Sequence, residues 1–125
     1  MRGRKGVMFP IRERYFFECF GCPDTSETIL QRLFDKIVEK SGMKLLAPPQ
    51  AVKVDDGVSI QGIWEASTLA IHGWDEPKLV TIDIYSCRHI NALEMANVIN
   101  EILNPKMITF SAIMPNDMIT ILRRE

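Results

Sequence analysis

The 125 residues include 15 Lys and Arg against 16 Asp and Glu, which gives a formal net charge of −1. This balance excludes the basic footprint that binding to DNA, RNA or an anionic membrane requires. The length fits one domain, residues 1–125, with a core that needs neither disulfide nor metal. The chain lacks an apolar run of roughly 20 residues and an apolar leader, and its three cysteines are an odd set, so we expect a cytoplasmic protein with reduced thiols.

The first part of the chain predicts a strand and an amphipathic helix. Residues 14–20 are rich in aromatic side chains and favour a strand. Asp24, three residues before Glu27, has the spacing of a capping box, and apolar residues then recur with helical period until Gly42 ends the helix. Residues 43–47 suit a short strand before a pair of prolines.

The middle of the chain predicts extended structure. Asp55-Asp56-Gly57 indicates a turn. Residues 58–74 are too long for one typical strand of about 5 or 6 residues, so they form two strands or one strand that bends sharply near residues 65–68. Residues 79–87 alternate between two faces. One face carries Val80, Ile82 and Ile84, and the other carries Thr81, Asp83, Tyr85 and Cys87.

The last part of the chain predicts a second helix and two strands. Asn91 and Glu94 form another capping-box pattern, an apolar stripe follows, and Pro105 ends the helix. Residues 107–113 and 117–122 read as strands. Two helices cannot cover both faces of a sheet of six or more strands, so the predicted fold class is α+β: a two-layer sandwich of a mainly antiparallel sheet with both helices packed on one face.

Four short patterns occur in order over roughly residues 12–112. They are Glu18-Cys19-Phe20-Gly21-Cys22 in the first strand, Val58-Ser59 after a turn, the segment from Glu65 to Glu76, and Ile82-Asp83-Ile84-Tyr85-Ser86-Cys87. The third pattern holds Ser67, then His72 five residues later, then Trp74 and acidic residues. Together the four resemble the S-adenosylmethionine decarboxylase family of small bacterial and archaeal proenzymes, which use a pyruvoyl cofactor.

The resemblance implies that the chain cuts itself between Ala66 and Ser67. The Ser67 hydroxyl would attack the Ala66 carbonyl and turn the amide into an ester. Elimination would then release chain 1–66 and leave a pyruvoyl group at the start of chain 67–125. The ketone of that group would form a Schiff base with the amine of a small amino-acid-type substrate and accept the electrons left when CO₂ departs, without a metal.

The resemblance also assigns roles to individual side chains. It implies processing roles for Ser59 and His72, proton donation by Cys87, substrate binding by Trp74 and Glu76, and a weaker catalytic candidacy for Glu18. One physical constraint follows from the spacing of two of them. Ser67 and His72 are five residues apart, so a regular strand would place them on opposite faces, and shared chemistry requires a bend or bulge between them.

Two departures from the family leave alternatives open. The residue that stacks on adenine in the family would fall near Lys53 or Val54, and neither is aromatic. Arginine or ornithine is therefore an alternative to S-adenosylmethionine as substrate. Ala66 and Thr68 replace the glutamate and histidine that commonly flank the serine, which favours a second alternative: an unprocessed, catalytically silent homologue that acts as a regulatory or binding partner.

The C-x-x-C pattern of Cys19 and Cys22 has the form of a redox pair or half a zinc site. A zinc site needs two more ligands, and Cys87, His72 and His89 are the Cys and His residues that remain. We interpret the cysteines as reduced thiols and expect no metal.

One sheet face would lie open in a single copy of the chain. It carries Tyr85 and first-strand aromatics, which are unfavourable as a contiguous exposed patch. Small members of the resembled family pair two copies with active sites near the contact. We therefore expect a homodimer with Glu18 and Cys87 near the interface.

Overall fold

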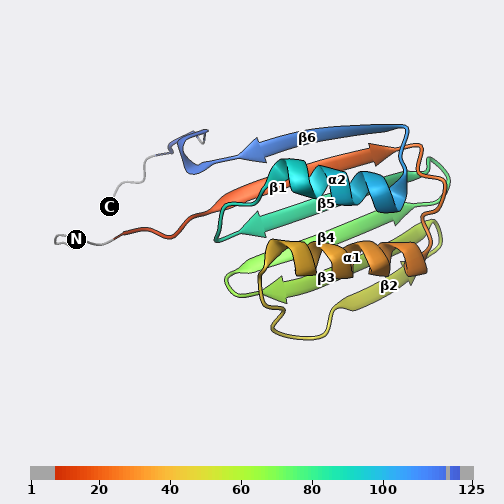
Figure 1. The fold of residues 1–125 in the computed structure, drawn as a ribbon, viewed down its shortest axis with the longest axis horizontal. Helices are drawn as coiled ribbons and strands as arrows, with labels where there is room; N and C mark the ends of the chain where they lie inside the picture. The colour runs from red at the N-terminus through yellow and green to blue at the C-terminus, as the bar shows by residue number, and fades with distance from the viewer. Residues whose placement is uncertain (1–7, 118, 122–125) are drawn as a thin grey trace.

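The computed structural model of the protein describes residues 8–117 and 119–121. Six antiparallel strands form one sheet in the order β2-β3-β4-β5-β1-β6 (Figure 1). Their bounds are β1 (Glu13–Phe20), β2 (Gln50–Val54), β3 (Gly57–Trp64), β4 (Ser67–Trp74), β5 (Leu79–Ser86) and β6 (Met107–Ile113).

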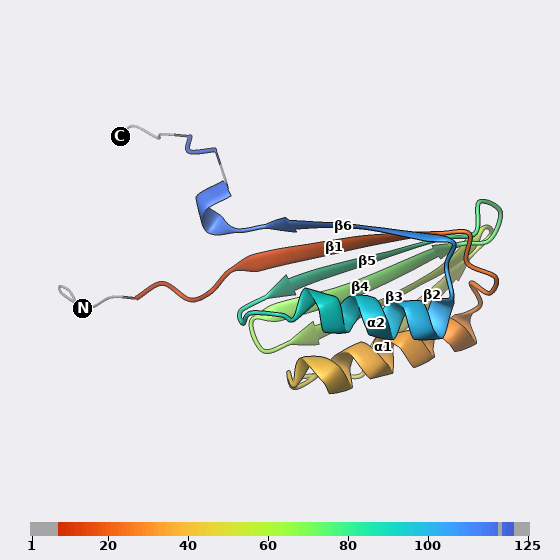
Figure 2. The same ribbon diagram turned by 45° about the horizontal axis from the view of Figure 1, so that its top comes forward.

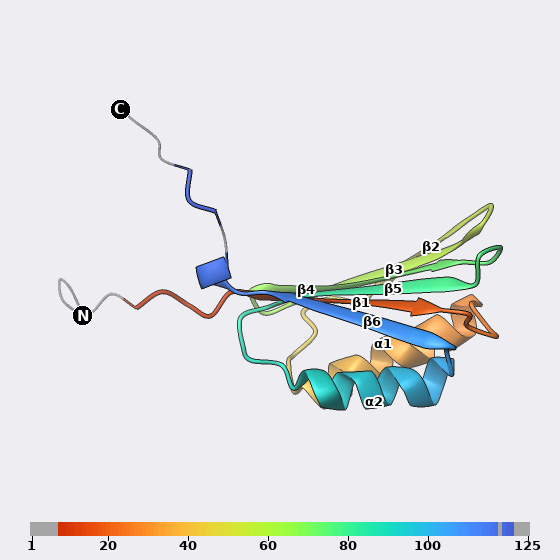
Figure 3. The same ribbon diagram turned by 90° about the horizontal axis from the view of Figure 1, so that it is seen from above.

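Two helices, α1 (Glu27–Ser41) and α2 (Ala92–Leu103), lie side by side on one face of this sheet. The turned view of Figure 2 shows them as one layer, and Figure 3 shows the other sheet face bare of helices. The predicted α+β sandwich with both helices on one face is confirmed. Within the described ranges, no helix is both long and apolar enough to cross a lipid bilayer.

The start of α1 differs from the prediction by two residues. Ser26 is the N-cap, and its hydroxyl accepts a hydrogen bond from the Ile29 N–H at 3.4 Å. The Asp24 carboxylate instead accepts from the Ser26 N–H at 2.9 Å, so the predicted cap stabilises the turn that leads into the helix. The predicted end is correct, because Gly42 has the left-handed φ of 70° that a C-cap favours.

The ends of α2 are as predicted. The Asn91 side chain accepts a hydrogen bond from the Glu94 N–H at 3.0 Å. Asn104, with a φ of 47°, is the C-cap, and Pro105 follows it. At both helix starts, a polar side chain thus accepts a hydrogen bond from a backbone N–H that has no partner within the helix.

Two predicted strands are wrong. Residues 43–47 make only an isolated bridge, from Leu45 to Trp64, and the edge strand next to β3 is β2, later in the chain. All five residues of β2 are exposed, so no alternation of apolar side chains marks it. Residues 115–117 form a short 3-10 helix and residues 119–121 no strand, while 118 and 122 lie outside the described residues.

The long extended stretch, residues 58–74, forms a hairpin of two strands, which is one of the two predicted alternatives. β3 and β4 pair in continuous register and are joined by a two-residue turn, Glu65-Ala66. Strand alternation then separates the side chains of β4. Ser67, Leu69 and Ile71 are buried on the helix side, and Thr68, Ala70 and His72 point to the open face.

The core lies between the sheet and the helices. The predicted faces of residues 79–87 are confirmed, because Val80, Ile82 and Ile84 are fully buried. Apolar positions of both helices complete the core: Leu30, Leu33, Phe34 and Ile37 from α1, and Met95, Val98, Ile99 and Leu103 from α2. This packing holds the sheet and thereby the ends of β3, β4 and β5, where the candidate site residues lie.

Close contact between β3 and α1 gives a stability prediction. We expect Gly62→Ala to lower the free energy of unfolding by about 1–3 kcal/mol, because the added Cβ would lie 2.5 Å from Phe34 Cζ. Phe34 is fully buried and its ring cannot move aside freely. Urea denaturation followed by circular dichroism measures the change. Gln61→Ala, at the exposed neighbouring residue, is the control and should change stability by less than about 0.5 kcal/mol; equal losses in both variants would contradict this packing.

Candidate active site

Ser67 and Cys87 meet at the end of the sheet, although 20 residues separate them in sequence. Ser67 is the first residue of β4, and its side chain is buried. Its hydroxyl oxygen accepts a hydrogen bond from the Cys87 N–H at 2.9 Å, and the Cys87 thiol donates to the Glu65 carbonyl at 3.2 Å. The antiparallel register of β4 and β5, which pairs Thr68 with Tyr85, brings the two residues together. A hydroxyl and a thiol are therefore held beside the β3–β4 turn.

The residue before Ser67 has a strained backbone. Ala66 has a φ of 52°, in the left-handed region that costs a non-glycine residue roughly 1–2 kcal/mol. It is the second residue of the two-residue turn, whose length requires an unusual conformation. Strain therefore lies next to the peptide bond at which the sequence predicts cleavage.

Ser59 and His72 form a second group on the open face. They are directly opposite each other in the β3–β4 register, and Ser59 Oγ lies 2.7 Å from His72 Nδ1. The pairing continues from His72 to Thr81 and from Thr81 to Glu18. Glu18 therefore lies in the same row across the sheet, two strands and about 10 Å from His72. A hydroxyl, an imidazole and a carboxylate thus line one row of the open face.

The bend that the sequence argument required between Ser67 and His72 is not found. β4 pairs with β3 without interruption from Ser67 to Trp74, and with β5 from Thr68 to Trp74. At about 3.3 Å per residue, Ser67 and His72 are roughly 17 Å apart along the strand. A single chain therefore presents two separate groups, one with Ser67 and Cys87 and one with Ser59 and His72.

The two substrate-binding candidates lie beyond His72. Trp74 ends β4, is 38% exposed, and its ring centroid is 6.1 Å from that of His72. Glu76 is exposed in the turn that follows. Lys53 lines a pocket of about 280 Å³ at the start of α1, together with Thr25 and Asp75. Trp74 therefore extends the open-face group, and Lys53 lies at the edge of the sheet.

The two thiols of the C-x-x-C pattern are fully buried. Burial raises the pKa of the Cys19 thiol to about 12 and also raises the pKa of Cys22. The Cys22 thiol donates a hydrogen bond to the Cys19 carbonyl at 3.4 Å. Both are free thiols in the core, and the described residues contain no group of three or more His, Cys, Asp or Glu placed to hold a metal.

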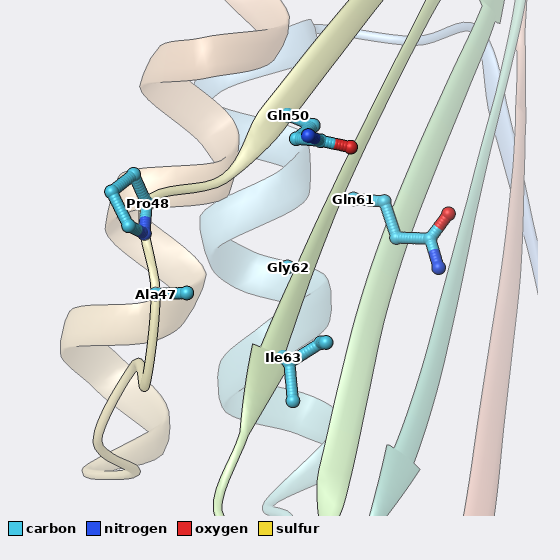
Figure 4. A pocket seen from close by; sticks show the side chains of 6 residues that line it. All are labelled: Ala47, Pro48, Gln50, Gln61, Gly62 and Ile63. Carbon is cyan, nitrogen blue, oxygen red and sulfur yellow. The ribbon is translucent and has the colours of Figure 1, made fainter.

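Figure 4 shows a pocket of about 350 Å³ between β3 and the chain that leads into β2. Its lining residues are Ala47, Pro48, Gln50, Gln61, Gly62 and Ile63. The side chains of Gln50 and Gln61 both extend from paired positions of β2 and β3. The lining contains none of the predicted site residues, so the pocket is separate from both groups.

Sequence reasoning missed the polar contacts around the segment that follows Cys87. Glu13 is buried at the start of β1 and contacts Tyr15 and His89. The available signal was its spacing, because Glu13, Tyr15 and Phe17 alternate onto the buried face of one strand. A carboxylate on the same strand face as buried aromatic residues is unusual enough to indicate that it has a hydrogen-bond or ion-pair partner.

The fold places the chain in a class of two-layer α+β proteins that includes a solved decarboxylase. The crystal structure of the adenosylmethionine decarboxylase from Aquifex aeolicus VF5 matches with a TM-score of 0.73 and 17% sequence identity, over 94% of this chain and 100% of that chain. At this identity the match shows a shared fold.

The family follows from sequence comparison. A family model described as S-adenosylmethionine decarboxylase matches residues 13–114, and the chain belongs to this family. The resemblance drawn from the four patterns is thus confirmed. The match includes both candidate groups, since Glu18, Ser59, Ser67, His72 and Cys87 all fall within it.

Archaeal relatives are similar over part of their length. The S-adenosylmethionine decarboxylase proenzyme of Sulfolobus acidocaldarius is 37% identical over 71 residues, 57% of this chain and 57% of that protein. The proenzyme of Saccharolobus islandicus is 32% identical over 66% of this chain and 67% of its own. The proenzyme of Aeropyrum pernix is 30% identical over 72% of this chain and 70% of its own.

The contrast between the three thiols gives a prediction that needs no assumption about activity. Iodoacetamide added to the folded protein should modify Cys87 and leave Cys19 and Cys22 unmodified, because burial protects these two and raises their pKa. Peptide mass spectrometry identifies the site. All three cysteines should react after denaturation, and folded Cys87→Ala should give no adduct. An adduct on Cys19 or Cys22 in the folded protein would contradict the burial of these two thiols.

Proposed function

We propose that the protein is a self-processing, pyruvoyl-dependent decarboxylase of S-adenosylmethionine, which acts in the synthesis of the polyamine spermidine. One observation carries the proposal: Ser67 lies beside a strained turn and in contact with Cys87. These are the two residues that would make the cofactor and return the proton. The archaeal relatives are named proenzymes, which supports self-processing.

The geometry around Ser67 supports the cleavage step. The Ser67 hydroxyl would attack the Ala66 carbonyl, which forms an ester and relieves the left-handed strain at Ala66. The oxygen that accepts the Cys87 N–H is the one that carries the ester. When the Ser67 α-proton is removed and the Cβ–Oγ bond then breaks, that N–H stabilises the negative charge that develops on the leaving carboxylate. The dehydroalanine left at position 67 would take up water and lose ammonia, which leaves the pyruvoyl group at the start of chain 67–125.

The same contact supports the later proton transfer. The pyruvoyl group made from Ser67 supplies the electron sink for decarboxylation. The Cys87 thiol is held at the Glu65 carbonyl beside the turn, so it lies next to the position where this group would form. A thiol there can donate a proton to the substrate carbon after CO₂ leaves. Its partial exposure allows substrate to reach it, in contrast to the two core cysteines.

The separation of Ser67 from His72 supports a homodimer with a shared site. Regular strand geometry leaves these residues roughly 17 Å apart in one chain, so His72 cannot act on its own Ser67. The row of Ser59, His72 and Glu18 lies on the face that no helix covers (Figure 3). The Ser67 side chain is buried on the helix side, but the Ala66–Ser67 bond lies in the β3–β4 turn at the end of the sheet. A second copy seated on the open face with its strands reversed would bring this turn opposite the row, and twofold symmetry would complete two equivalent sites.

Side chains near the open-face group suit the substrate. Trp74 offers an aromatic ring and Glu76 a carboxylate for a cationic amino-acid derivative. The adenine-stacking position at Lys53 differs from the family, so arginine and ornithine are the comparison substrates. CO₂ release from S-adenosylmethionine, and little from the other two, is the expected result. Three free thiols fit a cytoplasmic location.

The cleavage site gives the first functional prediction. Purified protein should contain chains 1–66 and 67–125, the second beginning with a group that reacts with ketone reagents, and Ser67→Ala should stay full length. Intact-mass spectrometry measures both. Cys87→Ala is the matched control: it should still cleave, because its backbone N–H remains to hold Ser67, but it should decarboxylate poorly or give wrong products. Wild-type protein that stays full length after long incubation, with no ketone, would refute the proposal.

The shared site gives the second functional prediction. His72→Ala and Ser67→Ala should each stay uncleaved when expressed alone. In mixed dimers of the two, the His72→Ala chain keeps Ser67 and faces the intact Ser59–His72 pair of its partner, so this chain should be cleaved.

Different affinity tags on the two variants allow mixed dimers to be isolated and their chains weighed. Cleavage of the His72→Ala chain alone supports a shared site. If the His72→Ala chain stays full length in verified mixed dimers, the two groups do not act across the interface. A monomeric protein with full activity would lead to the same conclusion.

A further inference from the structure

A buried carboxylate lies at the start of β1, away from both candidate groups. Glu13 is 5% exposed, and both of its side-chain oxygens have partners. The Tyr15 hydroxyl donates a hydrogen bond to Oε1, and Oε2 lies 2.8 Å from His89 Nδ1. Burial of a carboxylate is unfavourable unless it is fully hydrogen-bonded, and this one is satisfied by two side chains from different parts of the fold.

Tyr15 extends this network to the backbone. Its hydroxyl accepts a hydrogen bond from the Ile90 N–H at 3.2 Å. Tyr15 is 4% exposed, and burial, followed by its hydrogen bond to Glu13, raises the pKa of its hydroxyl. The hydroxyl therefore stays protonated and can donate to Glu13 while it accepts from Ile90. One side of β1 is thereby tied to two successive residues, His89 and Ile90.

These two residues belong to the β5–α2 connection, residues 87–91, which passes from the sheet to the helix layer (Figure 3). The residue before them is also held, since the Arg88 N–H donates to the Ser86 hydroxyl at 2.9 Å. Cys87 begins the connection, with its N–H on Ser67 and its thiol on Glu65. Each residue from 87 to 90 therefore has a polar contact that fixes its place.

We propose that Glu13 and Tyr15 are positioning residues for Cys87: they anchor the β5–α2 connection so that the Cys87 amide stays on Ser67 and its thiol stays beside the turn. This inference rests on the proposed function for its chemical meaning. Its structural part, the control of Cys87 by β1, stands on the contacts alone. Neither residue touches the reacting atoms, so their effect reaches the site only through the connection.

The placement explains why polar groups are used here. The connection leaves the sheet, so no strand partner holds its backbone, and apolar contacts alone would allow it to slide. Directional hydrogen bonds to His89 and Ile90 specify one position. An error of about 1 Å in the position of a reacting group can lower a rate by as much as 100-fold, so a firmly held connection matters for a thiol that must return a proton to one carbon.

Thiol reactivity tests the anchor without reference to activity. Tyr15→Phe removes one hydroxyl and frees the Ile90 N–H, and Glu13→Leu keeps the volume but removes both acceptors. In each, Cys87 should react with iodoacetamide severalfold faster than in wild type, and the amides of residues 87–90 should exchange hydrogen faster. Glu13→Gln keeps an acceptor for Tyr15 and a polar partner for His89, so it should stay near the wild-type rate. Tyr85→Phe, which removes the other tyrosine hydroxyl of the chain, is the matched control.

Turnover then tests the positioning role. In the processed fraction of Tyr15→Phe and Glu13→Leu, kcat should fall on the order of tenfold while KM changes less than about twofold, with a larger share of wrong products. Glu13→Gln should restore kcat. A purely structural role would be met equally by Leu and Gln, and would lower stability without a difference in product ratio.

The outcomes separate this inference from the proposed function. Unchanged Cys87 reactivity and amide exchange in folded Tyr15→Phe and Glu13→Leu would overturn the anchor. If both variants fail to fold, His89→Ala takes their place, because the His89 side chain is 77% exposed and its removal leaves the core intact; an unchanged rate there would likewise overturn it. If the variants change the reactivity of Cys87 but the wild-type protein shows no decarboxylation, the anchor holds and the proposed enzyme function is refuted.

Discussion

The continuous pairing of β4 with both of its neighbours is the constraint on which the rest of the structure depends. In one direction it joins the β3–β4 turn to the end of β5, and this brings Ser67 to Cys87. In the other it places His72 opposite Ser59, on the face without helices. Because side chains alternate along a strand, the same regularity that forms each group also keeps the two groups apart.

Under the proposed function, this separation assigns a role to the uncovered sheet face. Both helices are used on one side to bury the apolar residues of the sheet, and the other side keeps a row of hydroxyl, imidazole and carboxylate groups. Exposed aromatic side chains on such a face are unfavourable in water, whereas its polar groups can line a binding site. The proposed dimer resolves both points, because one contact would cover the aromatic residues of the face and bring the β3–β4 turn of one chain, which carries the proposed cleavage bond, opposite His72 of the other.

Chemistry at the turn combines strain with fixed donors. Ala66 holds a left-handed conformation next to the bond proposed to break, while the Cys87 N–H and thiol contact groups on either side of that residue. Strain persists only where the surroundings hold it in place. The two-residue turn and the segment after β5 provide that support, and the contacts of this segment connect the first residues of β1 to the proposed cleavage site.

Local patterns in the sequence determined the fold class, the helices and the candidate residues. Alternation in residues 79–87 and the caps at Gly42 and Asn91 are short-range effects, and the structure has them as predicted. Where burial and periodicity are absent, prediction failed: β2 is exposed throughout, and residues 43–47 form only a single bridge.

Tertiary structure alone decided which candidates meet. Contacts such as Ser67 with Cys87 depend on the register between strands, and one partner of Glu13, His89, lies more than 70 positions away along the chain. Sequence spacing showed that Ser67 and His72 conflict within one regular strand. Only the uninterrupted pairing of β4 decided that no bend removes the conflict, since hydrogen bonds to two neighbouring strands keep it straight.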